Sequence, residues 1–120
     1  MTYWDTDGTE YKWNIIEDVS TWDESSGYYC YIGGDKPLSI IENPEIQDGS
    51  SCLVLKESYG NCFVPFLVDH YETVYVVDFR YANVNVVDYV KEKNIQDLII
   101  MNNITIIGSD KVASTIAGLL

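Results

Sequence analysis

Ser58 is the residue of this chain best placed for covalent chemistry. It lies in a polar string, residues 56–61 (KESYGN), which directly follows an apolar run. A serine at the turn that leaves a buried strand exposes its hydroxyl, and the backbone N–H groups after it can face a developing oxyanion. Gly60 and Asn61 complete this loop, and Asn102, which follows a later apolar run, is a candidate for a further oxyanion donor. These residues predict acyl transfer through a serine nucleophile.

Each of these residues also has a purely structural interpretation. Serine is among the preferred helix N-caps, so Ser58 could serve only as a cap. Asparagine is common in turns, which is the structural alternative for Asn102. Asp78 and Arg80 follow another apolar run and suit an ion pair at the rim better than a catalytic role. Spacing alone leaves both interpretations of Ser58 and Asn102 open.

A serine nucleophile needs a base, and His70 is the only histidine in the chain. It follows Ser58 by 12 positions. If a helix fills that gap, the two residues are roughly 18 Å apart at about 1.5 Å per residue. A general base must come within about 3 Å of the proton that it takes. We therefore expect His70 at the opposite end of the sheet and no acid–base partner for Ser58.

Alternating strands and helices must position these residues. Continuous apolar runs predict strands that are buried on both faces, at 52–55, 73–77 and 98–101. Helical spacing predicts helices at 59–71, 84–94 and 110–119. This alternation implies right-handed crossovers and a parallel sheet. In a flavodoxin-like strand order the first strand lies between the other two, so the polar groups that follow the three strands share one rim.

The N-terminal part has a different character. Residues 1–27 form a polar and aromatic segment, and within it 12–19 fits a short strand or a helical turn equally well. Residues 28–32 and 38–42 are predicted strands that could pair as a hairpin-like β excursion, because turn formers follow each of them. The predicted organisation is therefore an N-terminal segment, 1–27, and one α/β domain, 28–120.

The charge balance limits the partners. Seven basic and 19 acidic residues give a net charge of -12, so neither nucleic acid nor an anionic membrane surface is an expected partner. No apolar run approaches the length of a membrane span, and the N-terminal residues do not resemble a signal peptide.

The three cysteines predict neither a metal site nor a disulfide framework. Cys30, Cys52 and Cys62 are odd in number and lack zinc-ligand spacing. We expect three free thiols, no bound metal and no cofactor.

Several strings together resemble the DHHW family of proteins. They are residues 56–67 (KESYGNCFVPFL), His70-Tyr71, Val76-Val77-Asp78 and Arg80-Tyr81, and upstream Gly33-Gly34, Pro37-Leu38, Ile41 and Asn43-Pro44. The resemblance runs from about residue 28 to residue 107. Its specificity lies in the long ordered string around Ser58, since each piece alone is weak.

The resemblance implies a fold and a chemistry. DHHW proteins are similar to SGNH hydrolases and to cell-envelope polysaccharide O-acetyltransferases. This implies a flavodoxin-like three-layer α/β sandwich, here a partial SGNH-hydrolase fold with an N-terminal β excursion, and ester chemistry at Ser58. The Asp-His-His-Trp motif that names the family does not precede Ser58 in this sequence. We therefore expect a catalyst that is incomplete without that motif, which an upstream domain of a parent protein could supply.

Two functions of different classes follow. The first is a serine esterase or O-acetyltransferase acting on a carbohydrate or another cell-envelope ester, outside the cell or on its surface. The second is a non-catalytic extracellular module that binds carbohydrate or protein through the N-terminal aromatic residues Tyr3, Trp4, Trp13 and Trp22. Exposed tryptophan and tyrosine rings suit such binding.

Overall fold

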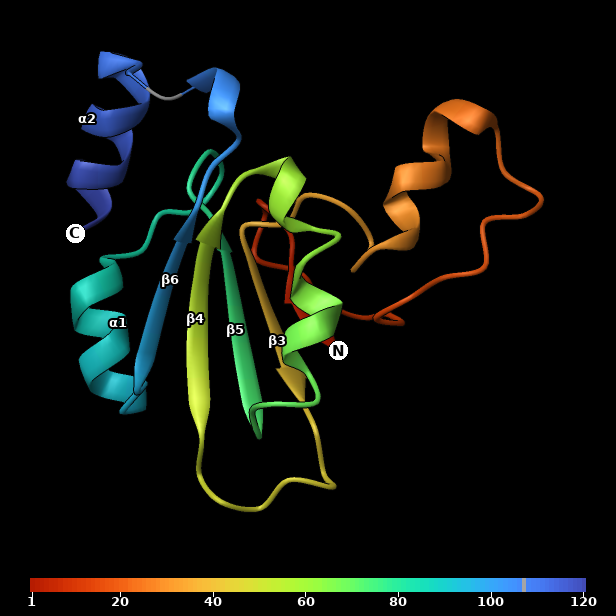
Figure 1. The fold of residues 1–120 in the computed structure, drawn as a ribbon, viewed down its shortest axis with the longest axis horizontal. Helices are drawn as coiled ribbons and strands as arrows, with labels where there is room; N and C mark the ends of the chain where they lie inside the picture. Colours follow the sequence, from red (N-terminus) through yellow and green to blue (C-terminus); the bar gives the residue numbers. More distant parts are fainter. Residues whose placement is uncertain (107) are drawn as a thin grey trace.

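The computed structural model describes residues 1–106 and 108–120, which leaves Ile107, the last residue of the resemblance above, outside the described residues. The described residues form one mixed six-stranded sheet in the order β2-β1-β3-β5-β4-β6 (Figure 1). The strands are β1 (Thr2–Trp4), β2 (Glu10–Lys12), β3 (Leu38–Glu42), β4 (Ser51–Lys56), β5 (Thr73–Asp78) and β6 (Asp97–Met101). The helices are α1 (Val86–Lys93), α2 (Asp110–Leu119) and four 3-10 helices, η1 (Glu24–Cys30), η2 (Ser58–Gly60), η3 (Val64–Leu67) and η4 (Ile104–Ile106).

The three apolar runs form the parallel part of the sheet. β4 lies between β5 and β6 and runs parallel to both, with Leu55 opposite Val77 on one side and Ile100 on the other. All six residues of β4 are buried. The predicted order of these three strands, with the first in the middle, is confirmed.

The other half of the sheet is antiparallel, so the prediction of a parallel sheet holds only for β5, β4 and β6. β3 pairs antiparallel with both β5 and β1, and β2 pairs antiparallel with β1. The connection from β3 to β4, residues 43–50, is too short to carry the chain back along the sheet, which a parallel neighbour requires. The chain therefore reverses direction between these two strands.

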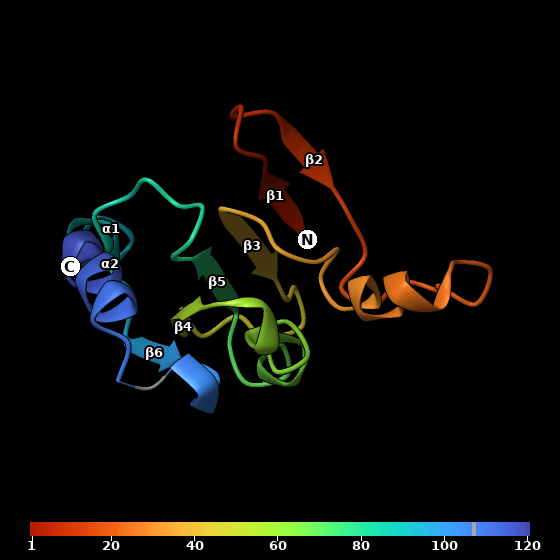
Figure 2. The same ribbon diagram turned by 90° about the horizontal axis from the view of Figure 1, so that it is seen from above.

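Different elements cover the two faces of the sheet. On one face, Leu53 and Leu55 of β4 pack with Val86 of α1 and with apolar side chains of α2. On the other face, Cys52 and Val54 pack with apolar residues of η3 and of the N-terminal half. Figure 2 shows α1 and α2 together on one side of the strands and the short helices of the segment 58–67 on the other.

The predicted strand at 28–32 is wrong. Residues 24–30 form η1, and the pairing that remains there is a single bridge between Tyr31 and Ile16. The chain then turns through three consecutive residues with positive φ, Ile32 (49°), Gly33 (67°) and Gly34 (81°), which a strand cannot accommodate. β3 therefore pairs with β1 and β5 rather than in a hairpin with 28–32.

The predicted helix at 59–71 is also wrong. The segment consists of η2, η3 and turns. Pro65 lacks an N–H group and its ring would clash with the carbonyl of Asn61, so an α-helix cannot run through it. By contrast, α1 lies within the predicted 84–94, between the Asn85 N-cap and the left-handed Asn94, and α2 matches 110–119.

β6 is an edge strand rather than a fully buried one. Leu98 and Ile100 are 43% and 47% exposed.

Within residues 1–106 and 108–120, no helix is both long enough and apolar enough to span a membrane. No cluster of three or more potential metal ligands occurs in the same residues.

We expect all three cysteines to be alkylated in denaturant and Cys52 alone to be protected in the native state. Cys52 is fully buried, and this burial, helped by the charge of Asp97, raises the pKa of its thiol to about 12. The reactive thiolate is then scarce at neutral pH. Cys30 and Cys62 are half-buried free thiols. Mass spectrometry after non-reducing alkylation, with and without denaturant, gives the counts. A denatured chain with only one labelled cysteine would reveal a disulfide and contradict the prediction.

Candidate nucleophile site

Ser58 lies where the central parallel strand ends, at the first position of η2. The N-cap of η2 is Glu57, not Ser58, because the Glu57 carboxylate accepts the N–H of Tyr59 at 3.1 Å. The same carboxylate accepts the Ser58 hydroxyl at 3.2 Å and the N–H of Asn103 at 3.0 Å. Glu57 therefore caps η2 in place of Ser58, and the Ser58 hydroxyl donates its hydrogen bond to the Glu57 carboxylate.

Gly60 and Asn61 hold the serine turn against the strand below it. A Cβ atom on Gly60 would lie 2.6 Å from Cβ of Lys56, so the turn can approach β4 this closely only with glycine. Asn61 is buried, and its side-chain N–H donates to Asp35 at 2.9 Å. Its side-chain oxygen is buried without a hydrogen-bond partner.

A buried network of charges supports the turn. Lys56, at the end of β4, has a fully buried side chain whose Nζ lies 3.2 Å from Asp78 and 3.5 Å from Asp35. Arg80 donates to Asp78 through Nε at 3.0 Å and Nη2 at 2.7 Å, and Nη2 also lies 2.8 Å from Asp35. Asp78 and Arg80 therefore form the ion pair that their spacing suggests. The hydrogen bond to Asp78 raises the pKa of Arg80, so the guanidinium stays charged.

Two cavities flank Ser58, and among the described residues Ser58 alone lines both. The larger, of about 530 Å³, lies toward α2 and is also lined by Glu57, Tyr59, Phe79, Arg80, Asn103, Ile106, Lys111, Val112 and Thr115. The smaller, of about 220 Å³, lies toward η1 and is also lined by Ser25, Tyr28, Tyr29, Gly34, Asp35 and Asn61. A group attached to Ser58 therefore has space on either side.

Asn102 does not line either of these cavities. It borders a separate cavity together with Ser109 and Val112, and its side-chain oxygen is buried without a partner. Its neighbour Asn103 reaches the Ser58 turn through the hydrogen bond to Glu57. The oxyanion role of Asn102 stays a prediction.

His70 lies at the opposite end of the sheet from Ser58. Ser58 follows the last residues of β4, whereas His70 precedes the first residue of its parallel neighbour β5. The six-residue strands separate these ends by roughly 17 Å at about 3.3 Å per residue. His70 is exposed and has no access to the Ser58 hydroxyl.

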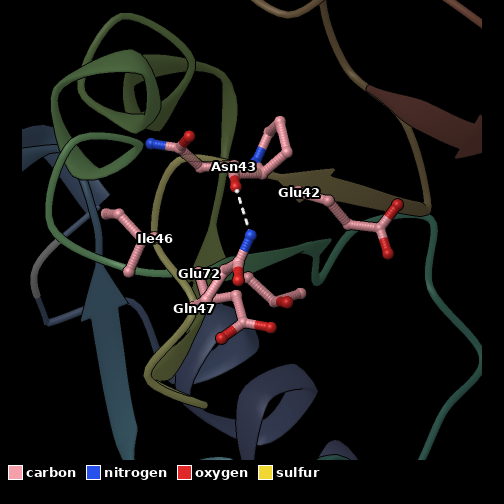
Figure 3. A pocket seen from close by; sticks show the side chains of 7 residues that line it. Glu42, Asn43, Ile46, Gln47 and Glu72 are labelled. Atoms are coloured by element: carbon pink, nitrogen blue, oxygen red, sulfur yellow. Dashed lines mark hydrogen bonds between the residues drawn. The ribbon is translucent and has the colours of Figure 1, made fainter.

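A further cavity lies at that opposite end (Figure 3). It measures about 400 Å³, and its lining residues are Glu42, Asn43, Pro44, Ile46, Gln47, Glu72 and Thr73. Its polar groups already serve the surrounding loops: Asn43 donates to the carbonyl of Val68, and Glu72 accepts the N–H of Gly49. This arrangement braces the loop before β4.

The sequence reasoning missed Tyr28, Tyr29 and Asp35 as neighbours of Ser58. Tyr28 donates its hydroxyl to the backbone carbonyl of Ser58 at 2.9 Å. These residues precede Ser58 by more than 20 positions. Asp35 directly follows the turn formers Gly33-Gly34, which predict a turn there, but no local spacing indicates its distant partners.

Fold and site together define an α/β protein with a serine at the carboxyl end of the central parallel strand of a mixed sheet. The DHHW family model matches residues 3–77, more than half of the chain. The chain therefore belongs to the DHHW family.

Two solved proteins resemble it over most of its length. A DHHW family protein from Eubacterium siraeum is 30% identical, with a TM-score of 0.81 over 98% of this chain and 39% of its own. PatB1 of Bacillus cereus is 27% identical, with a TM-score of 0.73 over 91% of this chain and 36% of its own. PatB1 has also been solved with a sulfonyl adduct. The chain thus spans well under half the length of these two proteins. A comparison with curated proteins found no match.

Proposed function

We propose that this chain carries the nucleophile of an SGNH-like serine esterase or O-acetyltransferase that acts on a carbohydrate or another cell-envelope ester. The observation that carries the proposal is the position of Ser58, at the carboxyl end of the central parallel strand and between two cavities. Parallel α/β sheets generally bind ligands at this end. The parallel strands with their two covered faces are proposed to be part of a flavodoxin-like, three-layer SGNH fold.

The proposed reaction begins with attack of the Ser58 hydroxyl oxygen on the acyl carbon of an ester. The hydroxyl proton passes to a base and then to the leaving alcohol, while the acyl group stays on Ser58. Water or a sugar hydroxyl then takes the acyl group, which gives hydrolysis or transfer. A sulfonyl electrophile traps a nucleophilic side chain covalently, so the sulfonyl adduct of PatB1 supports nucleophilic chemistry in a relative.

The base is proposed to come from an Asp-His pair upstream of this sequence, as the family motif implies. Among the described residues, the one ionisable side chain hydrogen-bonded to the Ser58 hydroxyl is Glu57. Glu57 also accepts two backbone N–H groups. One carboxylate oxygen accepts the Ser58 hydroxyl and the N–H of Tyr59, and the other accepts the N–H of Asn103, so these contacts fix the side chain beside the serine. Glu57 therefore orients Ser58 rather than activating it.

Covalent labelling tests the proposal. We expect a longer chain, in which the Asp-His-His-Trp segment precedes this sequence, to react with a fluorophosphonate probe and to carry the label on Ser58. The Ser58→Ala variant of that chain should not be labelled. As a matched control, Ser109→Ala, which replaces the N-cap serine of α2, should leave labelling unchanged. Absence of label on Ser58 in the longer chain would exclude the serine mechanism.

The alternative function is a non-catalytic extracellular module that binds carbohydrate or protein. Trp13 and Trp22 are 37% and 41% exposed and could take part. Tyr3 is buried beside Tyr11 and cannot. If the longer chain is never labelled at Ser58 but the protein binds a glycan, this alternative is favoured.

A further inference from the structure

The smaller cavity beside Ser58 has walls of a distinctive kind. It combines the rings of Tyr28 and Tyr29 with the carboxylate of Asp35. Tyr28 and Tyr29 are 42% and 52% exposed, although both line a concave site. Aromatic faces beside hydrogen-bond acceptors suit a ligand that presents both C–H groups and hydroxyls.

The position of the Tyr29 ring depends on Gly34. A Cβ atom on Gly34 would lie 2.3 Å from Cδ1 and 2.7 Å from Cε1 of Tyr29, and Gly34 has a φ of +81°. Any other residue would therefore displace the ring and strain the backbone. The preceding Ile32 also has positive φ, which is unfavourable for a β-branched residue. The turn accepts this strain while it places the ring and Asp35 beside Ser58.

Tyr28 is fixed more directly. Its hydroxyl donates to the carbonyl of Ser58, and its ring packs edge-on against Tyr31 with centroids 5.5 Å apart. Burial is the main factor that raises the pKa of this hydroxyl, so it remains a donor at neutral pH. Tyr28 is thus tied to the backbone of Ser58, while the ring of Tyr29 packs against Gly34.

Asp35 supplies a carboxylate acceptor that its neighbours hold in the charged form. Partial burial disfavours its charged form, but the hydrogen bond from Asn61 and the charges of Lys56 and Arg80 prevail and lower its pKa. About a quarter of its side chain, 26%, remains exposed. Its lone pairs can therefore accept hydroxyl groups of a ligand. Its charge, in a chain of net charge -12, disfavours a ligand carboxylate.

We propose that this cavity binds one neutral sugar unit, with the ring of Tyr29 against the face of the sugar and Asp35 accepting its hydroxyls. This inference rests on the proposed function, because it identifies the carbohydrate side of the same site. The bound sugar directs a hydroxyl, free or esterified, toward Ser58. The acyl group then extends into the larger cavity on the other side of Ser58.

NMR of the isotope-labelled 120-residue protein tests the inference. The probes are the tetramers of glucose, xylose, mannose and N-acetylglucosamine, with tetragalacturonate as the anionic counterpart. We expect at least one neutral tetramer to shift amide signals confined to residues 25–35 and 58–61, and tetragalacturonate to bind less tightly. Tyr29→Ala should weaken the neutral tetramer about tenfold, the loss of about 1.4 kcal/mol of binding free energy. Tyr11→Ala, which removes a 43% exposed ring on β2, should not change the affinity.

Two further variants separate the possible failures. Asp69→Ala, at an exposed position just before β5 and away from the cavity, should bind the tetramer with unchanged affinity. Gly34→Ala, if it folds, should weaken binding as Tyr29→Ala does. The inference is overturned if no neutral tetramer binds, if tetragalacturonate binds at least as tightly, or if the shifts centre on Trp13 or Trp22. None of these binding results would contradict the proposal that Ser58 is a nucleophile, which fluorophosphonate labelling tests. Absence of labelling, in turn, would not contradict sugar binding in this cavity.

Discussion

Asp78→Ala is expected to lower the free energy of unfolding by about 3–5 kcal/mol, because it leaves a buried lysine without its nearest counter-charge. Asp78 is completely buried and lies 3.2 Å from the Nζ atom of Lys56, which is itself fully buried. After the substitution, the one remaining acceptor near Nζ would be Asp35, at 3.5 Å and partly exposed. Thermal and urea unfolding followed by circular dichroism measure the loss, with an expected fall in Tm of about 10 °C or more.

A matched variant makes this result interpretable. Asp69→Ala removes the same side chain from an exposed position and should leave the stability within about 0.5 kcal/mol of the original. If Asp78→Ala does not fold at all, Asp78→Asn, which keeps the size and one acceptor, should give a folded protein of intermediate stability. Equal stability of Asp78→Ala and Asp69→Ala would show that the charge network contributes nothing.

The second large effect concerns turnover. We expect the longer chain with the Asp-His-His-Trp segment to hydrolyse an aryl acetate, and its Ser58→Ala variant to lose at least about 10³-fold in kcat. The serine hydroxyl is a weak nucleophile without an adjacent base, and the loss of either partner removes the shared pathway. Steady-state release of the coloured phenol measures both proteins.

The 120-residue chain provides the complementary measurement. We expect it to hydrolyse the same ester no faster than its own Ser58→Ala variant, because His70, the single histidine of the sequence, lies at the far end of the sheet. His70→Ala should therefore change nothing. Hydrolysis by the short chain that disappears with His70→Ala would refute this geometry and make His70 the base.

The parallel part of the fold could be predicted from the sequence, because a strand that is buried on both faces appears as a continuous apolar run. The apolar runs of β4 and β5 predict central strands, and the middle position of β4 is that of the first strand in a flavodoxin-like order. The place of Ser58 at the end of β4 follows from the same two facts. Once β4 and β5 are parallel, His70 must lie at the other end whether or not the intervening segment is a helix.

The remaining errors come from interactions that a local pattern does not record. Residues 28–32 contain β-favouring tyrosines, yet the positive φ values from Ile32 onward exclude a strand there. The antiparallel pairing of β3 with β5 depends on a short loop and not on the composition of either strand. The long-range partners of Asp35 and Glu57 are 21 to 46 positions distant, and no spacing rule reaches that far.

The open edge of β6 determines how such a protein behaves at high concentration. Within the described residues, one side of β6 pairs with β4 and its other side has no partner strand, while Leu98 and Ile100 are exposed. Such an edge is a template for intermolecular strand pairing. The net charge of -12 opposes this association through long-range repulsion between chains. Dissolved salt screens that repulsion but leaves the apolar attraction in place, so the colloidal stability of the protein is set by ionic strength as well as by folding.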